Sequence, residues 1–170
     1  MFDDIDMHIV NILQHDARTS NADIARRLEM APSAIFERIR KLEARGVLRG
    51  YEARVNPDAL CLGLLAFVFV RADEPLGSST AGQALAALPE VQEVHHVAGE
   101  DCYLVKVRVA DTTALGHLLR DTFAAIPAIR STRTTIVLST LKESALLPVP
   151  IPEDAQKTQD TQDIQEARRA

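Results

Sequence analysis

SNADIARRLEMAPSAIFERIRKLEARG, residues 20–46, has the pattern of two short helices joined by a tight turn. Ser20 can cap the first helix, with Asp23 three residues on as the reciprocal carboxylate. Pro32 falls in the first turn of the second helix, where its missing N–H costs no hydrogen bond. Gly46 suits a left-handed stop at the end of that helix. The stretch therefore predicts a helix-turn-helix.

The second of these helices has one apolar side and one polar side. Ile35, Ile39 and Leu42 repeat at the spacing of a single buried face. In a helix-turn-helix the other side faces the DNA major groove, where the first residues reach base edges and later basic ones suit phosphates. The alternative is that this side of the helix is simply exposed to solvent and contacts no DNA. The candidate DNA contacts are Ser33, Ala34, Phe36, Glu37, Arg38, Arg40 and Lys41.

For two of these candidates the sequence predicts a more specific role. A glutamate such as Glu37 can accept a hydrogen bond from cytosine N4. Arg38 lies nearer the buried face than the others, so it could instead tie the helix to its neighbours.

Charge is unevenly distributed along the 170 residues. The whole chain carries a formal charge of −5, which argues against a protein coated by nucleic acid. Residues 18–49 nevertheless hold eight basic residues against four acidic ones. A local basic surface on an acidic chain suits a DNA-binding face that releases its DNA readily.

The segments around the helix-turn-helix complete a first domain, residues 1–55. Asp3 and Asp4 favour a helix start, and Ile5, Ile9, Ile12 and Leu13 follow at helical spacing. Residues 47–55, VLRGYEARV, predict a two-stranded wing or a strand leaving the domain. Asn56-Pro57-Asp58 opens a linker, residues 56–63.

Residues 64–146 have the order strand-helix-strand-strand-helix-strand. Strands are expected at 64–70, 91–97, 102–109 and 129–141, with one helix before Pro89 and one from Asp111 to Pro127. This is the order of a ferredoxin-like fold, so the chain is α+β. Two helices cover one face of such a sheet. The first strand, LLAFVFV, is apolar on both faces, so a second subunit is expected to cover the other face.

The tail, the N-terminus and the cysteines indicate where the protein acts and which cofactors it lacks. The tail, residues 147–170, is polar and expected to be disordered. The acidic N-terminus is not a secretory signal, and the apolar run 60–70 is too short to span a membrane, so a cytoplasmic, nucleoid-associated protein without membrane contact is expected. Cys61 and Cys102 form no metal-spaced cluster, so no metal or other cofactor is expected.

The chain resembles the Lrp/AsnC family of transcription regulators, also called leucine-responsive or feast/famine proteins. The resemblance covers residues 3–144 and is carried by DDIDMHIVNILQHDARTSNADIARRL, APSAIFERIRKLEARGVLRGYEARVNP, VAGEDCYLVKVRV and IRSTRTTIVLSTLKES. It implies a winged helix-turn-helix joined to a ferredoxin-like domain that dimerises through its sheets, with dimers that often form octamers. It also implies an amino-acid effector and control of amino-acid metabolism or transport genes.

Two positions depart from the family pattern. Ala31 stands where a serine commonly caps the recognition helix, a loss of about 1 kcal/mol unless Ser33 substitutes. The effector loop commonly reads Gly-x-x-Asp-Tyr, whereas this chain has Cys102 at the aspartate position and a carboxylate one place earlier. The expected effector residues are Gly99, Glu100, Asp101, Cys102, Tyr103, Thr132 and Thr134; the alternative is a polar hairpin turn beside sheet-edge threonines.

Two other functions are compatible with the sequence. One is a nucleoid-organising protein with little effector response. The other rests on His95-His96, because some tetrapyrrole-decarboxylating enzymes of similar fold use histidines. Adjacent strand residues face opposite sides of a sheet, so the two histidines do not readily serve one site. A DNA-binding regulator that is not an enzyme is therefore preferred.

Overall fold

A computed structural model describes residues 2–75 and 77–150. The described residues form two compact units. One holds residues 2–53 together with 144–150, and the other holds residues 54–143. Each unit has its own hydrophobic core.

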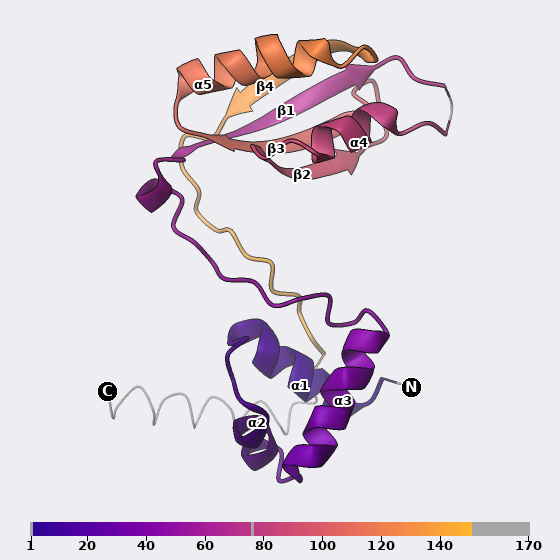
Figure 1. The fold of residues 1–170 in the computed structure, drawn as a ribbon, viewed down its shortest axis with the longest axis vertical. Coiled ribbons are helices and arrows are strands. Elements are labelled where there is room, and N and C mark those ends of the chain that lie inside the picture. Colours follow the sequence, from indigo (N-terminus) through magenta and orange to yellow (C-terminus); the bar gives the residue numbers. More distant parts are fainter. Residues whose placement is uncertain (1, 76, 151–170) are drawn as a thin grey trace. The chain divides into compact units, whose positions relative to one another are not determined.

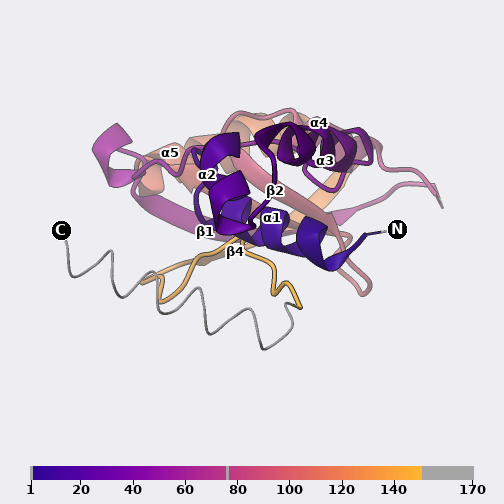
Figure 2. The ribbon, with the colours of Figure 1, turned by 90° about the horizontal axis from the view of Figure 1, so that it is seen from below.

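The first unit is a bundle of three helices, α1 (Asp4–His15), α2 (Asn21–Arg27) and α3 (Pro32–Ala44) (Figures 1 and 2). Each helix contributes an apolar stripe to one shared core. The caps explain why the helices begin where they do. Asp3 accepts the N–H of Asp6, and Ser20 accepts the N–H of Asp23. The fully buried members of the core are Ile9, Ile24, Ile35 and Leu42.

Three backbone positions shape the ends of the helices. Gly46 has φ +68°, so the expected left-handed stop after α3 is confirmed. Ala31 is the N-cap of α3 and makes no side-chain hydrogen bond to the helix, so the serine cap common in the family is missing. Glu29, in the turn between α2 and α3, also lies in the left-handed region, at φ 53°.

The expected wing is wrong in the described residues, because no strand lies between α3 and β1. After Gly46 the chain turns back so that Leu48 packs against the helical core, and Tyr51 donates its hydroxyl hydrogen to Glu43. The rest of residues 49–56 is exposed and has no neighbouring strand. A strand needs a hydrogen-bonding partner, and this single short run finds none among the described residues.

The second unit is a four-stranded antiparallel sheet in the order β2-β3-β1-β4 (Figure 1). Its strands are β1 (Leu64–Ala72), β2 (Val91–His96), β3 (Tyr103–Val109) and β4 (Ile129–Ile136). A short 3-10 turn, η1 (Asp58–Leu60), precedes β1, and α4 (Thr80–Ala86) joins β1 to β2. This is the expected ferredoxin-like order, now confirmed.

The connection from β3 to β4 differs from the single helix that was expected. It consists of α5 (Thr112–His117), a π-helical turn η2 (Leu118–Thr122) and a 3-10 turn η3 (Phe123–Ala125). Leu118 and Phe123 are five residues apart and would diverge on an ideal α-helix. The π-turn brings them into phase, so Leu115, Leu118 and Phe123 are all buried on the sheet.

The helices of the second unit cover one face of the sheet and leave the other face partly exposed. Val68, Val70, Val105 and Val107 point toward the helices and are fully buried there. We call the opposite side the outer face. On it Phe67 and Phe69 are only half-buried, and the register places Lys106 beside Phe67.

The chain itself supplies part of the cover of the outer face, which sequence reasoning had left to a second subunit alone. Glu143, beyond β4, forms ion pairs with Lys106 and with Arg108, the latter at 3.5 Å. The expected strand 129–141 is correspondingly too long: β4 ends at Ile136, and only Val137 adds one hydrogen bond, to Leu65. Beyond the start of β1 there is no strand left to pair with.

The last described residues return to the first unit. The side-chain amide of Gln14 donates to the carbonyl of Leu147 at 3.2 Å, and its oxygen accepts the N–H of the same residue at 2.8 Å. Most of the expected disordered tail, from residue 151 onward, lies outside the described residues.

Candidate functional site

The solvent side of α3 carries most of the expected DNA contacts. Ser33, Phe36, Glu37, Arg40 and Lys41 are exposed, and Phe36 remains 52% accessible despite its apolar ring. They lie on the other side of the helix from the buried Ile35, Ile39 and Leu42. Ala34 is half-buried and lies beside them. The structure thus brings these residues together on one helix.

Charged groups on this side are lightly constrained. Arg40 donates to Glu37 at 3.0 Å, but both side chains are more than half exposed, so the pair contributes little to stability and can open for a ligand. Lys41 forms no ion pair with any residue of the described ranges. A flexible, unpaired ammonium next to an exchangeable guanidinium suits contact with phosphates.

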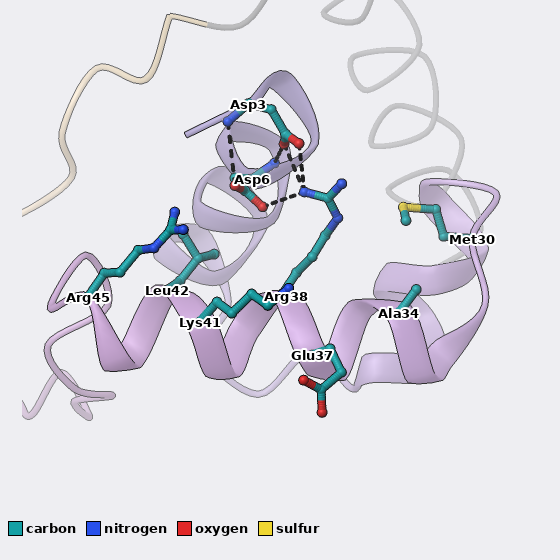
Figure 3. A pocket seen from close by; sticks show the side chains of 9 residues that line it. All are labelled: Asp3, Asp6, Met30, Ala34, Glu37, Arg38, Lys41, Leu42 and Arg45. Carbon is teal, nitrogen blue, oxygen red and sulfur yellow. Dashed lines mark hydrogen bonds and ion pairs between the residues drawn. The ribbon is translucent and has the colours of Figure 1, made fainter. Parts of the chain in front are cut away.

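Arg38 behaves differently from the other candidates. Its Nη1 lies 2.8 Å from Asp3 Oδ2 and 2.7 Å from Asp6 Oδ1, so the guanidinium joins α3 to the start of α1 (Figure 3). Glu37 points to the other side of the helix. The N–H of Asp6 and the Arg38 guanidinium hold the pKa of Asp3 below its ordinary value. A surface pocket of about 490 Å³ lies beside this cluster, with Lys41 and Arg45 also on its wall.

Sequence reasoning missed Asp3 and Asp6 as partners of Arg38. A signal for Asp6 was present, because it precedes Ile9 by three residues and so falls on the buried stripe of α1. A carboxylate on a buried stripe requires a cationic partner. Nothing in the sequence identified which of the neighbouring arginines would supply it.

The expected effector residues around the β2–β3 hairpin do not form one cluster. Gly99 has φ +135°, and a Cβ there would meet nothing within 4 Å, so the glycine is required by the backbone and not by crowding. Glu100 is exposed. Cys102 is half-buried, and its Sγ lies 3.3 Å from the carbonyl of Ala72.

Tyr103 is a core residue on the helix face of the sheet. Only 2% of it is exposed, and its hydroxyl donates to Glu74 Oε2 at 2.7 Å. Glu74 also accepts the N–H of Ala81 at 2.6 Å, which replaces the side-chain cap that α4 lacks. These two hydrogen bonds hold the pKa of Glu74 below its ordinary value. Burial, followed by Glu74, raises the pKa of the Tyr103 hydroxyl.

The two threonines lie apart from the hairpin carboxylates. Thr132 and Thr134 are opposite Val70 and Val68 in the register and therefore share the helix face of the sheet. Arg133, between them, faces the other way. Its guanidinium lies 4.0 Å above the Phe69 ring, and its Nη2 is 3.1 Å from Asp101 Oδ2. Arg133 is a candidate effector residue that sequence reasoning missed. Strand alternation alone already indicates that its side chain points to the opposite face of the sheet from Thr132 and Thr134.

His95 and His96 face opposite sides of β2, as expected. His95 contacts Glu93 at 3.1 Å, whereas the His96 ring lies 5.2 Å from that of Tyr103. Within the described ranges no group of three or more His, Cys, Asp or Glu side chains is arranged to hold a metal ion. No helix in those ranges is long and apolar enough to cross a bilayer.

Comparisons with known proteins fit both units. Residues 2–43 match the AsnC-type helix-turn-helix domain, and residues 65–147 match the Lrp/AsnC ligand binding domain. The chain belongs to the Lrp/AsnC family. It is therefore a DNA-binding transcriptional regulator, and its relatives are regulators and not enzymes.

Individual relatives of this Lrp/AsnC regulator cover nearly its whole described length. The leucine-responsive regulatory protein of Escherichia coli is 38% identical over 149 residues, which are 86% of this chain and 91% of that protein. A feast or famine regulatory protein from M. tuberculosis, solved in complex with L-methionine, is 38% identical, with a TM-score of 0.80 over 89% of this chain and 100% of that one. A transcriptional regulator from Neisseria meningitidis in complex with L-Met is 27% identical, with a TM-score of 0.82 over 88% and 98%.

Proposed function

We propose that α3 is the DNA-reading helix and that its exposed residues divide into two groups. Ser33, Phe36 and Glu37 lie in its first half and contact base edges. Arg40 and Lys41 follow and contact phosphates. The observation that carries this proposal is the exposure of these five side chains on the side of α3 that faces away from its core.

Binding to a DNA fragment selected from random sequences by the wild-type protein tests this division. Lys41→Ala should weaken binding to every sequence and lower the slope of log affinity against log salt by about one. Glu37→Ala should change base preference at one position by about 1–3 kcal/mol. Wild-type footprints from both variants would show that another surface reads the DNA. Uniform coverage of all sequences by the wild type would favour a nucleoid-organising protein instead.

We further propose that an amino acid binds at the Asp101–Arg133 pair beside the Gly99 turn. A zwitterion needs a cation for its carboxylate and an anion for its ammonium. The pair offers both within 3.1 Å, with Phe69 as an apolar floor. The Arg133 side chain is 65% exposed, so solvent weakens the pair and an amino acid can replace each partner by its own group. Complexes of two relatives with L-methionine support an amino-acid effector.

Calorimetry with three ligand types tests the effector site. After the twenty amino acids have been screened by thermal shift, the best one is compared with its des-amino acid and its decarboxylated amine. Arg133→Gln should weaken the two ligands with a carboxylate, and Asp101→Asn the two with an ammonium, each by about tenfold. Arg130→Gln, which removes a similarly exposed ion pair with Asp73, is the matched control. Equal affinities in Arg133→Gln, Asp101→Asn and wild type would move the site elsewhere.

The remaining features of the proposed function follow from the family. We propose a homo-oligomer, either a dimer or an octamer, in which the outer face of the sheet packs against a second copy. Phe69, half-buried and pointing to that face, is the test residue: Phe69→Asp should dissociate the oligomer in sedimentation, and a monomeric wild type would contradict the proposal. The protein would act in the cytoplasm on genes of amino-acid metabolism or transport, without catalysis by His95 or His96.

A further inference from the structure

Asp3, Asp6 and Arg38 form a cluster that the DNA contacts proposed above do not explain. Asp6 is only 7% exposed, and among the residues that the structure describes it is the one charged side chain classed as buried. Arg38 Nη1 contacts Asp6 Oδ1 at 2.7 Å and both oxygens of Asp3, at 2.9 and 2.8 Å. Asp3 in turn caps α1 by accepting the N–H of Asp6 at 2.9 Å.

This arrangement leaves Arg38 poorly suited to a DNA phosphate. A buried carboxylate that loses its cation is left uncompensated, which is strongly unfavourable. A phosphate that took the guanidinium would leave Asp6 in that state. The contacts of Arg38 with both acids converge on one nitrogen, so a small displacement of the guanidinium disturbs all of them together.

The cluster also fixes something that the apolar core does not. Contacts among Ile9, Ile35 and Leu42 are non-directional and tolerate a small rotation or slide of one helix along another. Charge-assisted hydrogen bonds are directional and hold one geometry. Arg38 lies between Glu37 and Lys41 on α3, so whatever fixes Arg38 relative to α1 also fixes where those two side chains point.

We infer that Asp3, Asp6 and Arg38 are positioning residues for DNA recognition: they lock α3 at one angle on α1, and Arg38 does not contact DNA. The inference rests on the proposed role of α3 as the DNA-reading helix. It predicts that the two aspartates and Arg38 act as one unit, because removing an aspartate or removing the arginine releases α3 from α1 in the same way. A phosphate contact would instead depend on Arg38 alone.

The test measures affinity and salt dependence for the full chain on the DNA fragment selected by wild type, at a temperature where circular dichroism shows each variant folded. Arg38→Gln and Asp6→Asn should each weaken binding by about tenfold, and the double variant should be no weaker than the weaker single variant. The salt slope should stay at the wild-type value in all three. If Asp6→Asn does not fold, Asp3→Asn replaces it in the test, because the Asp3 side chain is half-exposed.

Two further variants separate positioning from charge. Asp4→Asn removes the same charge from the same turn of α1, where no contact with Arg38 is lost, and should stay within about twofold of wild type. Arg38→Lys keeps the charge, but its side chain ends one bond short of the Nη1 atom that makes all three contacts, so it should be about as weak as Arg38→Gln. A salt slope lowered by about one in Arg38→Gln, with full affinity in Asp6→Asn and Arg38→Lys, would overturn the inference. Failure of the wild type to select any DNA would instead overturn the proposed function.

Discussion

Gly82→Ala should destabilise the ferredoxin-like unit, although Gly82 lies in the interior of α4 where alanine is ordinarily the better residue. A Cβ built at Gly82 would lie 2.6 Å from Cε1 and 3.1 Å from Cζ of Tyr103, whereas carbon atoms normally approach to about 3.5–4.0 Å. The ring cannot move aside, because it is buried and its hydroxyl is held by Glu74 at 2.7 Å.

The magnitude follows from two opposing terms. Alanine in place of a helical glycine contributes about 0.5–1 kcal/mol in its favour, and overpacking of a fixed ring costs about 1–3 kcal/mol. An overlap of about 1 Å against a buried ring belongs near the upper end of the overpacking range, so the free energy of unfolding should fall by roughly 1–2 kcal/mol. For a unit of this size the midpoint of thermal unfolding should fall by about 5–10 °C.

A matched glycine in the same unit provides the control. Gly116 lies in α5, and a Cβ there would meet nothing within 4 Å, so Gly116→Ala should raise the midpoint by a few degrees, about 0.5–1 kcal/mol. Scanning calorimetry on the full chain measures both variants. Tyr103→Leu removes the ring atoms, and in that background Gly82→Ala should no longer destabilise. An unchanged or raised midpoint in Gly82→Ala would refute the packing argument.

Three further changes test local features of the structure. Ala31→Ser should raise the stability of the helix-turn-helix unit by about 1 kcal/mol, measured by urea unfolding, because Ala31 already has the extended backbone of an N-cap but no capping oxygen. Gly46→Ala should lower it by about 1 kcal/mol in the same assay, because φ is +68° and a Cβ is strained there even though no neighbour is close. The pKa of Glu74 is lowered from 4.5 in the folded state, so its contribution to stability is present above pH 4.5 and is lost as pH falls through the folded value. Glu74→Gln should accordingly flatten the acid loss of stability of the ferredoxin-like unit, and an unchanged pH profile would contradict the assignment.

Features set by neighbouring residues along the chain could be predicted from the sequence. The stop at Gly46 and the missing cap at Ala31 depend on residues within one or two helical turns. The strand order could be predicted as well, because two helices between strands leave few topologies. The wing could not be predicted correctly, since strand-forming residues become a strand only where a partner backbone lies beside them.

The sites divide in the same way. Exposure of Glu37 and Lys41 follows from helical periodicity, so the solvent side of α3 could be identified in advance. The pairings Arg38–Asp6 and Arg133–Asp101 join residues 32 positions apart in each case, and only the packed structure reveals them. Thr132 and Thr134 were expected to offer hydroxyls to the same effector as the hairpin, but the register turns them to the opposite face of the sheet from Arg133.

The two hydrogen bonds between Gln14 and Leu147 can form only late in the synthesis of the protein. These residues lie 133 positions apart, and the entire ferredoxin-like unit is encoded between them. On the ribosome α1 emerges before the ferredoxin-like unit, yet the segment that contacts it at Leu147 emerges only after β4 has been synthesised. The ferredoxin-like unit is thus an insertion within the DNA-binding unit, and the contact of Gln14 with Leu147 can form only after the residues of the whole sheet have been synthesised.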